Sequence, residues 1–412
     1  MTRLVIEKLG AQGDGIAAGE RGPVYIPFAL PGEVVNAAVE KDRGTLLAVL
    51  EPSPARIEPA CRHFGDCGGC TLQHLRDDEY RAFKRDRVVQ ALRRERIDAA
   101  VGDLIPCSPA SRRRVTLSGR RPIAGMLLGY NRMQSHEIID IAECPIAVPD
   151  IVSALPKLRA LASTVSESGK PFHVTVTATE SGLDVAFIDA GKLADDRRRA
   201  ASHEATIAGL ARLAVDGETI IEPRKPAIDF GGAQVTPPAG GFLQAVASAE
   251  AAMAELVLGH LARARRVADL FAGAGAFALR LARGAEVTAV ESDAAALAAL
   301  DRGFRFSKGL KRVLTEKRDL FRRPLTFKEL NAFDGVVFDP PRAGAEDQSR
   351  QIAKSDVPLV AAVSCNPTTL ARDLRILIDG GYRIASLTPV DQFLWSGHVE
   401  AVALLEKPRK RR

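Results

Sequence analysis

The chain has 412 residues, of which 46% are hydrophobic, so it is long enough to form two or three domains with buried cores. No segment reaches the ~18 uncharged apolar residues of a membrane helix, and the start of the chain lacks the apolar segment of a signal peptide. The net charge is a mild +6, and the six cysteines do not resemble a secreted disulfide framework, so we expect a cytoplasmic protein without membrane association.

Residues 1–55 contain short segments in which apolar and polar positions alternate between Gly and Pro residues. This pattern predicts short strands, and the spacing favours a small β-barrel of the OB type, a fold that often binds RNA. Pro52 and Pro54 mark a linker after it.

Residues 56–235 are more irregular and begin with a cluster of cysteines. An amphipathic helix is predicted at residues 78–97 by the spacing of the apolar positions. Alternating segments such as "FHVTVTATES" and "GLDVAFIDA" follow, and they predict a central α+β domain with a mostly antiparallel sheet.

Residues 236–412 change pattern again, because buried strands now alternate with helices. The segments "RRVADLFAGAGAFALRLA" and "AEVTAVESDAAALAAL" each read as a strand, a turn and a helix, and "HVEAVALLEK" reads as a last strand. This alternation predicts an α/β domain with a doubly wound, mostly parallel sheet.

Positive charge is locally concentrated in three segments, Ser111–Arg121, Asp195–Ala200 and Lys407–Arg412. Such patches suit a polyanion, because each Lys or Arg that meets a phosphate releases counterions. Solvated loops are the alternative interpretation. An aromatic content of 5% does not indicate a broad stacking platform for single strands.

A glycine-rich turn, "DLFAGAGAF", follows the first strand of this last domain. Gly273 and Gly275 let the backbone approach a ligand, and the next helix offers its N-terminal N–H groups. Glu291 ends the next strand, where a carboxylate can accept hydrogen bonds from both ribose hydroxyls, and Asp319 is placed to hold an adenine. The turn lacks G-x-G-x-x-G and "DPPR" has no role in hydride transfer, so S-adenosylmethionine fits better than NAD.

Cys365 follows the apolar run "PLVAAV" and is expected at the carboxyl end of a strand, where open α/β sheets bind ligands. Asp339 lies at the same level on the preceding strand, before two prolines that stiffen the loop. A lone cysteine is more often a buried core residue. Together with Asp339, Glu291 and the turn, however, Cys365 is predicted to be a nucleophile.

The motifs "DLFAGAGAF", "VES", "FDPPRAG", "SCNPTTLARDL" and "GHVEAVALL" resemble those of the bacterial RNA uracil-C5 methyltransferases, in the same order and with similar spacing. The resemblance implies that the Cys365 thiolate adds to C6 of a uracil and that C5 then accepts a methyl group from S-adenosylmethionine. It points to Glu400 as the base that removes the C5 proton, and to Asp339 as a contact to the uracil edge. Ionisation of the thiol needs a helix N-terminus or a nearby cation, and the helix predicted after Cys365 is one source.

The same resemblance places Gln244, Phe271 and Ala276 in the methyl-donor pocket beside Glu291, Asp319 and Asp339. Two positions depart from the family, which often has Asn where this chain has Val246 and Ala276. Two other interpretations concern the base: Glu400 could be an exposed strand residue, and His398 is an adjacent candidate.

The cysteine cluster has the spacing C-x5-C-x2-C, and a distant cysteine is a fourth candidate ligand; the residues are Cys61, Cys67, Cys70 and Cys144. Four thiolates can hold Zn²⁺ or a [4Fe–4S] cluster. Zinc sites more often pair two C-x2-C units, and the resemblance to the ribosomal members implies the iron–sulfur cluster, in a structural or RNA-contacting role. Cys107 has no partner and is predicted to fill space in the core.

The cysteine cluster and the N-terminal barrel, of the TRAM type in this family, resemble the branch that acts on 23S rRNA. We therefore expect a uridine in 23S rRNA as the target, with no obligate protein partner. A tRNA uracil-C5 methyltransferase is one alternative. Another is an RNA-binding or ribosome-assembly protein whose methylation site has decayed, although the presence of Cys365, Asp339 and Glu400 together argues against it.

Overall fold

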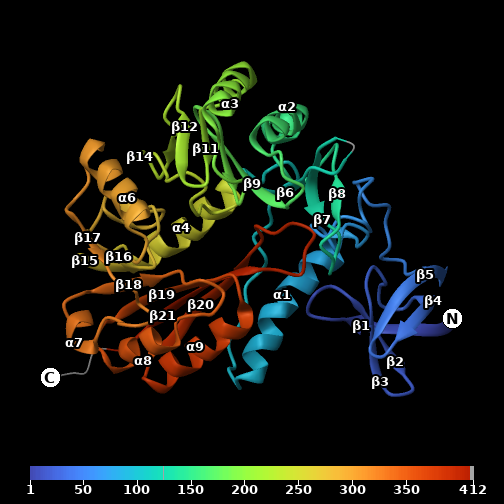
Figure 1. Ribbon diagram of the computed structural model, residues 1–412. Coiled ribbons are helices and arrows are strands. Elements are labelled where there is room, and N and C mark those ends of the chain that lie inside the picture. Colours follow the sequence, from blue (N-terminus) through green and yellow to red (C-terminus); the bar gives the residue numbers. More distant parts are fainter. Residues whose placement is uncertain (124, 409–412) are drawn as a thin grey trace.

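The computed structural model describes residues 1–123 and 125–408. A β-barrel at the N-terminus lies at one end of the molecule, and a central sheet and a C-terminal sheet form the remainder (Figure 1). The basic segment predicted at Lys407–Arg412 lies outside the described residues from position 409 onward.

The N-terminal barrel is closed, with the strand order β1-β2-β3-β5-β4 and pairing between β4 and β1. Alternate residues such as Leu4 and Ile6 on β1, or Val35 and Ala37 on β4, point inward and form its core. The predicted small β-barrel is therefore confirmed. Its strands are β1 (Thr2–Leu9), β2 (Gly15–Gly19), β3 (Gly22–Ile26), β4 (Val34–Glu40) and β5 (Arg43–Glu51).

The central sheet has the order β12-β11-β10-β9-β6-β7-β8, and every neighbouring pair except β10 and β11 is antiparallel. The predicted mostly antiparallel sheet is thus confirmed, and two helices pack on it. The elements are β6 (Arg114–Arg120), β7 (Leu127–Asn131), β8 (Ile138–Asp140), α2 (Pro149–Val165), β9 (Phe172–Thr179), β10 (Gly182–Ile188), α3 (Asp195–Ala208), β11 (Arg212–Val215) and β12 (Glu218–Ile221), followed by the short pair β13 (Ile228–Asp229) and β14 (Gln234–Val235).

The C-terminal sheet has the order β17-β16-β15-β18-β19-β21-β20. The strands from β17 to β19 are parallel, whereas β21 runs antiparallel to both of its neighbours, so the predicted mostly parallel sheet is confirmed. The strands are β15 (Arg266–Leu270), β16 (Glu286–Glu291), β17 (Val313–Lys317), β18 (Gly335–Phe338), β19 (Leu359–Ser364), β20 (Arg383–Val390) and β21 (Glu400–Glu406).

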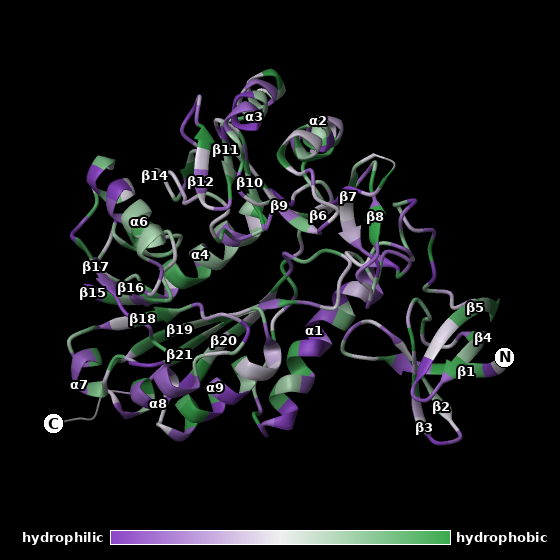
Figure 2. Ribbon diagram, in the orientation of Figure 1, coloured by the Kyte–Doolittle hydropathy of each residue, from purple (hydrophilic) through white to green (hydrophobic). Residues whose placement is uncertain are grey.

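Helices cover both faces of the C-terminal sheet, which makes it doubly wound (Figure 1). Successive strand residues alternate between the two faces: Val336 faces α1, α8 and α9, while Val337 faces α4 and α5. In Figure 2 the strands are mostly hydrophobic, while α8 carries hydrophilic residues. None of the described helices is long and apolar enough to cross a membrane. The helices are α1 (Asp77–Arg94), α4 (Ala247–Leu261), α5 (Ala278–Leu281), α6 (Ala294–Phe306), α7 (Phe327–Leu330), α8 (Glu346–Lys354) and α9 (Pro367–Asp379).

Helix α1 forms at the predicted position. It packs on the C-terminal sheet beside α9 and β20, although these elements lie far from it in the sequence. Its Lys84 is fully buried and forms an ion pair of 3.0 Å with Asp391, just after β20. The Lys84 ammonium also donates to the carbonyl oxygens of Phe393, at 3.0 Å, and His398. Tyr80 donates its hydroxyl proton to Asp391 at 2.6 Å. These contacts hold the segment between β20 and β21 against α1.

Replacing Lys84 by Met is expected to lower the free energy of unfolding by about 3–5 kcal/mol, because Asp391 would remain buried without its cationic partner. Chemical denaturation monitored by circular dichroism measures this change. The matched control is Arg81→Met on the same helix, which removes an exposed ion pair to Asp77 and should change stability by less than about 1 kcal/mol. Equal effects of the two variants would contradict a structural role for the buried pair.

Candidate active site

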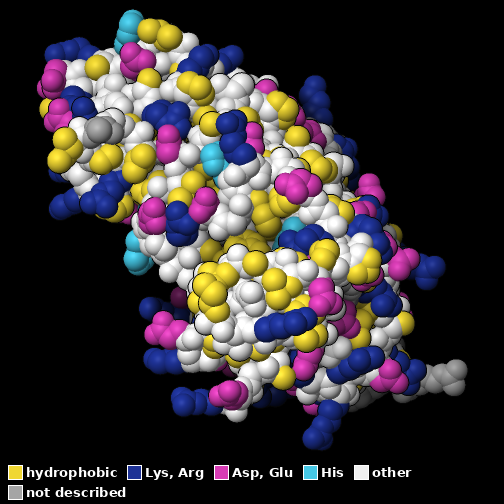
Figure 3. Space-filling model, turned by 90° about the vertical axis from the view of Figure 1, so that its right-hand side faces the viewer, with side chains coloured by type: hydrophobic (Ala, Val, Ile, Leu, Met, Phe, Trp, Pro, Cys, Tyr) yellow, Lys and Arg dark blue, Asp and Glu magenta, His cyan; other side chains and the backbone are white. Residues whose placement is uncertain are grey.

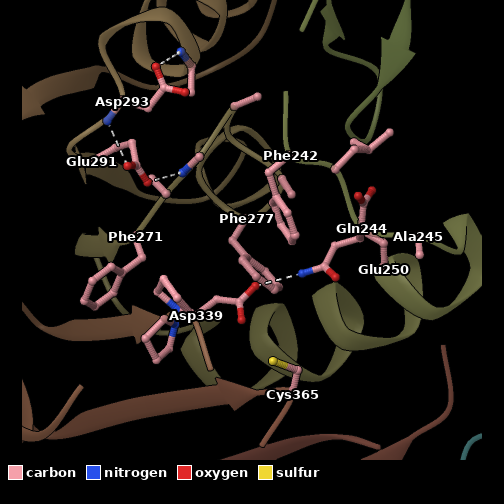
Figure 4. Close-up of a pocket in the computed structure, with 18 of the residues that line it drawn as sticks. Phe242, Gln244, Ala245, Glu250, Phe271, Phe277, Glu291, Asp293, Asp339 and Cys365 are labelled. Carbon is pink, nitrogen blue, oxygen red and sulfur yellow. Dashed lines mark hydrogen bonds between the residues drawn. The ribbon is translucent and has the colours of Figure 1, made fainter. Parts of the chain in front are cut away.

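A cavity of about 530 Å³ opens at the carboxyl edge of the C-terminal sheet (Figure 4). Residues at or just after the ends of five neighbouring strands line it, and they are Phe271, Glu291, Asp319, Asp339 and Cys365. Open α/β sheets bind ligands at this edge. The structure therefore brings the side chains singled out in the sequence into one cavity.

Cys365 lies between the end of β19 and the start of α9, and its side chain is half-buried. Burial raises the pKa of the thiol to about 11, and the nearby carboxylates of Glu400 and Asp339 also raise it. The Arg342 guanidinium acts in the opposite direction. The start of α9, expected from the sequence to favour ionisation, therefore does not outweigh burial and the two carboxylates.

Glu400 is the first residue of β21 and reaches the same edge because this strand runs antiparallel to β19, so that Ala401 pairs with Ser364. Its exposed fraction is only 3%, so the interpretation of Glu400 as an exposed strand residue is wrong. Burial raises the pKa of the Glu400 carboxyl, and the negative charge of Asp339 adds to this effect. Within residues 1–123 and 125–408, Glu400 Oε2 has no hydrogen-bond partner.

Two glutamine side chains connect the carboxylates of Asp339 and Glu400. Gln244 donates from Nε2 to Asp339 Oδ2 at 2.8 Å (Figure 4). Gln392 donates from Nε2 to Gln244 Oε1 at 2.7 Å and to Glu400 Oε1 at 2.6 Å. Both carboxylates therefore receive a hydrogen bond from a neutral amide. Burial raises the pKa of Asp339, which the bond from Gln244 partly offsets.

The other end of the cavity is formed by the glycine-rich turn and Glu291. Glu291 Oε2 accepts the N–H of Gly273 at 3.1 Å, and its Oε1 accepts the N–H groups of Ser292 and Asp293 at 2.7 and 2.9 Å. Gly273 has φ +53°, and a Cβ atom built there would meet nothing within 4 Å, so the turn faces open space. This end offers a bound molecule a carboxylate that is oriented by three backbone N–H groups.

Comparisons with known proteins identify the family. Residues 236–408 match the family described as tRNA (Uracil-5-)-methyltransferase. The chain is 64% identical over 410 residues to a protein of Mesorhizobium japonicum named an RNA methyltransferase, with 100% of this chain and 99% of the relative covered. It is 31% identical to the 23S rRNA (uracil(1939)-C(5))-methyltransferase RlmD of Vibrio vulnificus, with 98% and 96% covered. The chain belongs to the RNA uracil-C5 methyltransferase family.

The methyltransferase also shares its fold with a crystal structure from Pyrococcus abyssi, a tRNA (uracil-54, C5)-methyltransferase in complex with S-adenosyl-L-homocysteine. The TM-score is 0.76 at 24% identity, with 98% of this chain and 100% of that chain covered. That crystal structure contains S-adenosyl-L-homocysteine. In the present chain the turn at Gly273 beside Glu291 opens into the cavity.

Phe271 of the methyltransferase has φ +61°, and its ring packs against that of Phe321 with centroids 5.4 Å apart. Both line the cavity on the same side as Asp319. The helix expected after the glycine-rich turn is only the short α5, because the residues before Ala278 continue as turn. Support for a ligand from this helix end is therefore weaker than the sequence indicated.

The two departures from the family pattern lie in different surroundings. Ala276 lines the cavity. Val246 does not line it, because its side chain is 2% exposed and packs in the apolar core beneath α4. The Val246 side chain therefore contributes to core packing and not to the wall of the cavity.

His398, the adjacent candidate for the base, lines a different cavity from Cys365. Its Nδ1 lies 3.1 Å from Arg342 Nη2, and burial lowers its pKa to about 4. Glu400 is therefore the better-placed base of the two.

The cysteines predicted as ligands line a second cavity of about 330 Å³; they are Cys61, Cys67, Cys70 and Cys144. In residues 1–123 and 125–408, however, no group of three or more His, Cys, Asp or Glu side chains is arranged to hold a metal ion. The methyltransferase structure thus gathers the four thiols around one space without showing the predicted cluster. Cys107 packs against two apolar clusters.

The predicted basic patch at Ser111–Arg121 is only partly available to a polyanion. Arg113 is mostly buried and pairs with Glu250 at 2.7 Å. Arg112 and Arg114 line both the first and the second cavity, so they lie where the two approach each other. On the face shown in Figure 3, Lys and Arg side chains are interspersed with Asp and Glu side chains.

Gln392 and Arg342 are candidate functional residues that were not predicted from the sequence. Arg342 immediately follows Asp339-Pro340-Pro341, and this position was an available signal. Gln392 lies in a segment without regular periodicity. Its partner Gln244 is 148 positions away in the sequence, so no local pattern indicates that the two side chains meet.

Alkylation of Cys365 is expected to be slow at neutral pH and to accelerate as the pH rises toward 11, because the raised pKa keeps the thiol protonated. Glu400→Gln removes a negative charge next to the thiol, so its pKa should fall and alkylation at pH ~9 should be several-fold faster. Peptide mass spectrometry after timed iodoacetamide treatment measures the Cys365 peptide. An unchanged or slower rate in Glu400→Gln would contradict the electrostatic coupling.

Proposed function

We propose that this methyltransferase converts one uridine of 23S rRNA to 5-methyluridine, with Cys365 as nucleophile and Glu400 as base. The observation that carries the proposal is the convergence of Cys365, Asp339 and Glu400 in the cavity that also contains the turn at Gly273 and Glu291. A nucleophile, a base and a place for a methyl donor thus share one space.

In the proposed reaction the Cys365 thiol loses its proton to solvent, and the thiolate sulfur bonds to C6 of the uracil. The C5=C6 electron pair then shifts so that C5 becomes nucleophilic. When bound, S-adenosylmethionine would supply the electrophilic methyl group that C5 attacks, and it would leave as S-adenosylhomocysteine. Glu400 then takes the C5 proton, the C5=C6 double bond re-forms, and the thiolate leaves C6. A thiolate suits this role because it is both a nucleophile and a leaving group. Glu400 is suited to accept the proton because its Oε2 is unpartnered.

Asp339 is proposed to select uracil over cytosine. Its Oδ2 is occupied by Gln244, which leaves Oδ1 available to a base in the cavity. A carboxylate oxygen can accept the N3–H of uracil, whereas N3 of cytosine carries no hydrogen. The neutral amide of Gln244 keeps the carboxylate oriented without neutralising it.

Glu291 and Asp319 are proposed to hold the ribose and adenine of the methyl donor, with Phe271, Ala276 and Gln244 along its length. Among the described residues, Glu291 Oε2 accepts one hydrogen bond, from the N–H of Gly273, so this oxygen has capacity for a ribose hydroxyl. All five side chains line the same cavity.

The RNA target must be swung out of its stack, since C6 of a stacked base is inaccessible to a thiol at the edge of a sheet. Arg112 lines the cavity and is suited to contact a neighbouring phosphate. Arg114 also lines it, but its guanidinium donates to the carbonyl oxygens of Gly240 and Gly241. The 31% identity to the 23S rRNA enzyme over nearly the whole of both chains favours 23S rRNA. A tRNA target is the alternative outcome of the mapping experiment below.

We also propose that the four cysteines of the second cavity hold a [4Fe–4S] cluster, with Zn²⁺ as the alternative. Support comes from the position of all four side chains around one space and from the thiol chemistry of this donor set. The proposed role is structural, because methyl transfer needs no redox step.

Cys365→Ala is expected to bind RNA but to leave no 5-methyluridine, because the covalent step is lost. Glu400→Gln is expected to reduce turnover by about 10²- to 10⁴-fold and to accumulate a covalent protein–RNA adduct, because proton removal releases the enzyme. Denaturing gels and mass spectrometry of rRNA and tRNA from cells with and without the gene provide the measurements. Normal methylation by Cys365→Ala would disprove the mechanism, and 5-methyluridine lost only from tRNA would reassign the substrate.

Protein purified without oxygen is expected to contain iron and sulfide, with broad visible absorbance that is lost in a variant with Cys61, Cys67 and Cys70 changed to Ser. Cys107→Ser is the matched control and should retain the iron, because Cys107 does not line the second cavity. Zinc in place of iron in the anaerobic protein would favour the alternative metal.

A further inference from the structure

Gln392 is the second residue after β20, and its side chain is 2% exposed. Gln392 lines the cavity, and its side-chain amide forms hydrogen bonds with Gln244 and with the carboxylate of Glu400. The neighbouring residue, Asp391, is held by the buried Lys84. The contact between Lys84 of α1 and Asp391 therefore also holds the backbone of Gln392 in place.

The direction of every hydrogen bond in this group follows from one backbone donor. The N–H of Ala245 can only donate, and it donates to Gln392 Oε1 at 3.1 Å. The Nε2 of Gln392 must then face Gln244 Oε1 and Glu400 Oε1, and each of its two hydrogens has one acceptor. Because Gln244 Oε1 accepts, Gln244 Nε2 donates to Asp339.

Glu400 is consequently left with two different oxygens. Oε1 accepts a hydrogen bond of 2.6 Å from Gln392, whereas Oε2 is buried and has no partner in the part of the chain that the structure describes. An amide N–H cannot accept a proton from a carboxyl group, so Gln392 offers Oε1 only the role of acceptor. The oxygen that is free to take a proton is Oε2.

We propose that Gln392 is the positioning residue of the base: it holds Glu400 by Oε1, directs Oε2 to the C5 proton and ties the base to Gln244 at the methyl-donor side. This proposal rests on the proposed function. Gln392 itself contacts no reacting atom, and its effect is exerted through Glu400.

The charges around Glu400 explain why such a donor matters. Asp339 follows β18, Cys365 follows β19 and Lys84 extends from α1, and these are the titratable groups that interact with Glu400 from the packed elements. Asp339 and an ionised Cys365 disfavour the carboxylate, whereas Lys84 favours it. The hydrogen bond from Gln392 also favours the charged form and thus lowers the pKa of Glu400. Loss of this bond should raise that pKa.

The test is Gln392→Met, which keeps the approximate size of the side chain but removes both donated hydrogen bonds. The apparent pKa of the acidic limb in the pH profile of turnover should rise by about one to two units, as expected for loss of a hydrogen bond to a charged group. Turnover at pH ~7 should therefore fall about 10- to 100-fold. The methylated covalent adduct with RNA should accumulate, because its release needs the base. Gln392→Glu should shift the limb further, since it adds a carboxyl group beside Glu400.

Gln348→Met is the matched control, because Gln348 is also a buried glutamine and lies on α8, outside the residues that line the cavity. Within the described residues its side chain bonds the backbone of Leu325 alone. It should lower stability without moving the pH profile or accumulating adduct.

If folded Gln392→Met and Gln392→Glu both retain the wild-type acidic limb and adduct level, the positioning role is wrong. If Gln392→Met does not fold, Gln392→Glu decides the question alone. Normal methylation by Cys365→Ala, or no adduct in Glu400→Gln, would instead overturn the proposed function itself.

Discussion

The antiparallel insertion of β21 between β19 and β20 is the constraint on which the rest of the site depends. Parallel strands end at the edge where Cys365 and Asp339 lie, and only a strand that runs in the opposite direction can begin there. The pairing of Ser364 with Ala401 places Glu400 next to Cys365 at this edge. Because side chains alternate along a strand, a shift of one residue would turn Glu400 to the opposite face of the sheet.

This geometry gathers two carboxylates and a thiol in a largely buried space, where burial disfavours the charged form of all three groups. Asp339 also disfavours the charged form of Glu400, and both carboxylates disfavour the Cys365 thiolate. Neutral amides rather than cations make the direct contacts with the carboxylates, through Gln244 and Gln392. An arginine in the same place would form a tight ion pair and lower the pKa of the base, so that proton removal would be less favourable. Amide donors orient the carboxylates and leave them basic.

Much of this arrangement could be predicted from the sequence. Cys365, Asp339 and Glu291 each follow an apolar run, and parallel strands bring such positions to one edge. Glu400 required the family resemblance, because the direction of its strand is not encoded locally. The contacts of Gln392, the packing of α1 on a distant sheet and the pairing of Arg113 with Glu250 could not be foreseen, since each joins segments far apart in the chain.

The burial of Lys84 also bears on how this protein can be divided. The ammonium group is supplied by α1, more than a hundred residues before the first strand of the C-terminal sheet, yet it bonds the peptide carbonyls that precede Glu400. A fragment that begins at α4 would lack this helix and would expose the apolar surface that it covers. The C-terminal sheet is therefore not an independent structural unit. Any chimera that contains it must also contain α1.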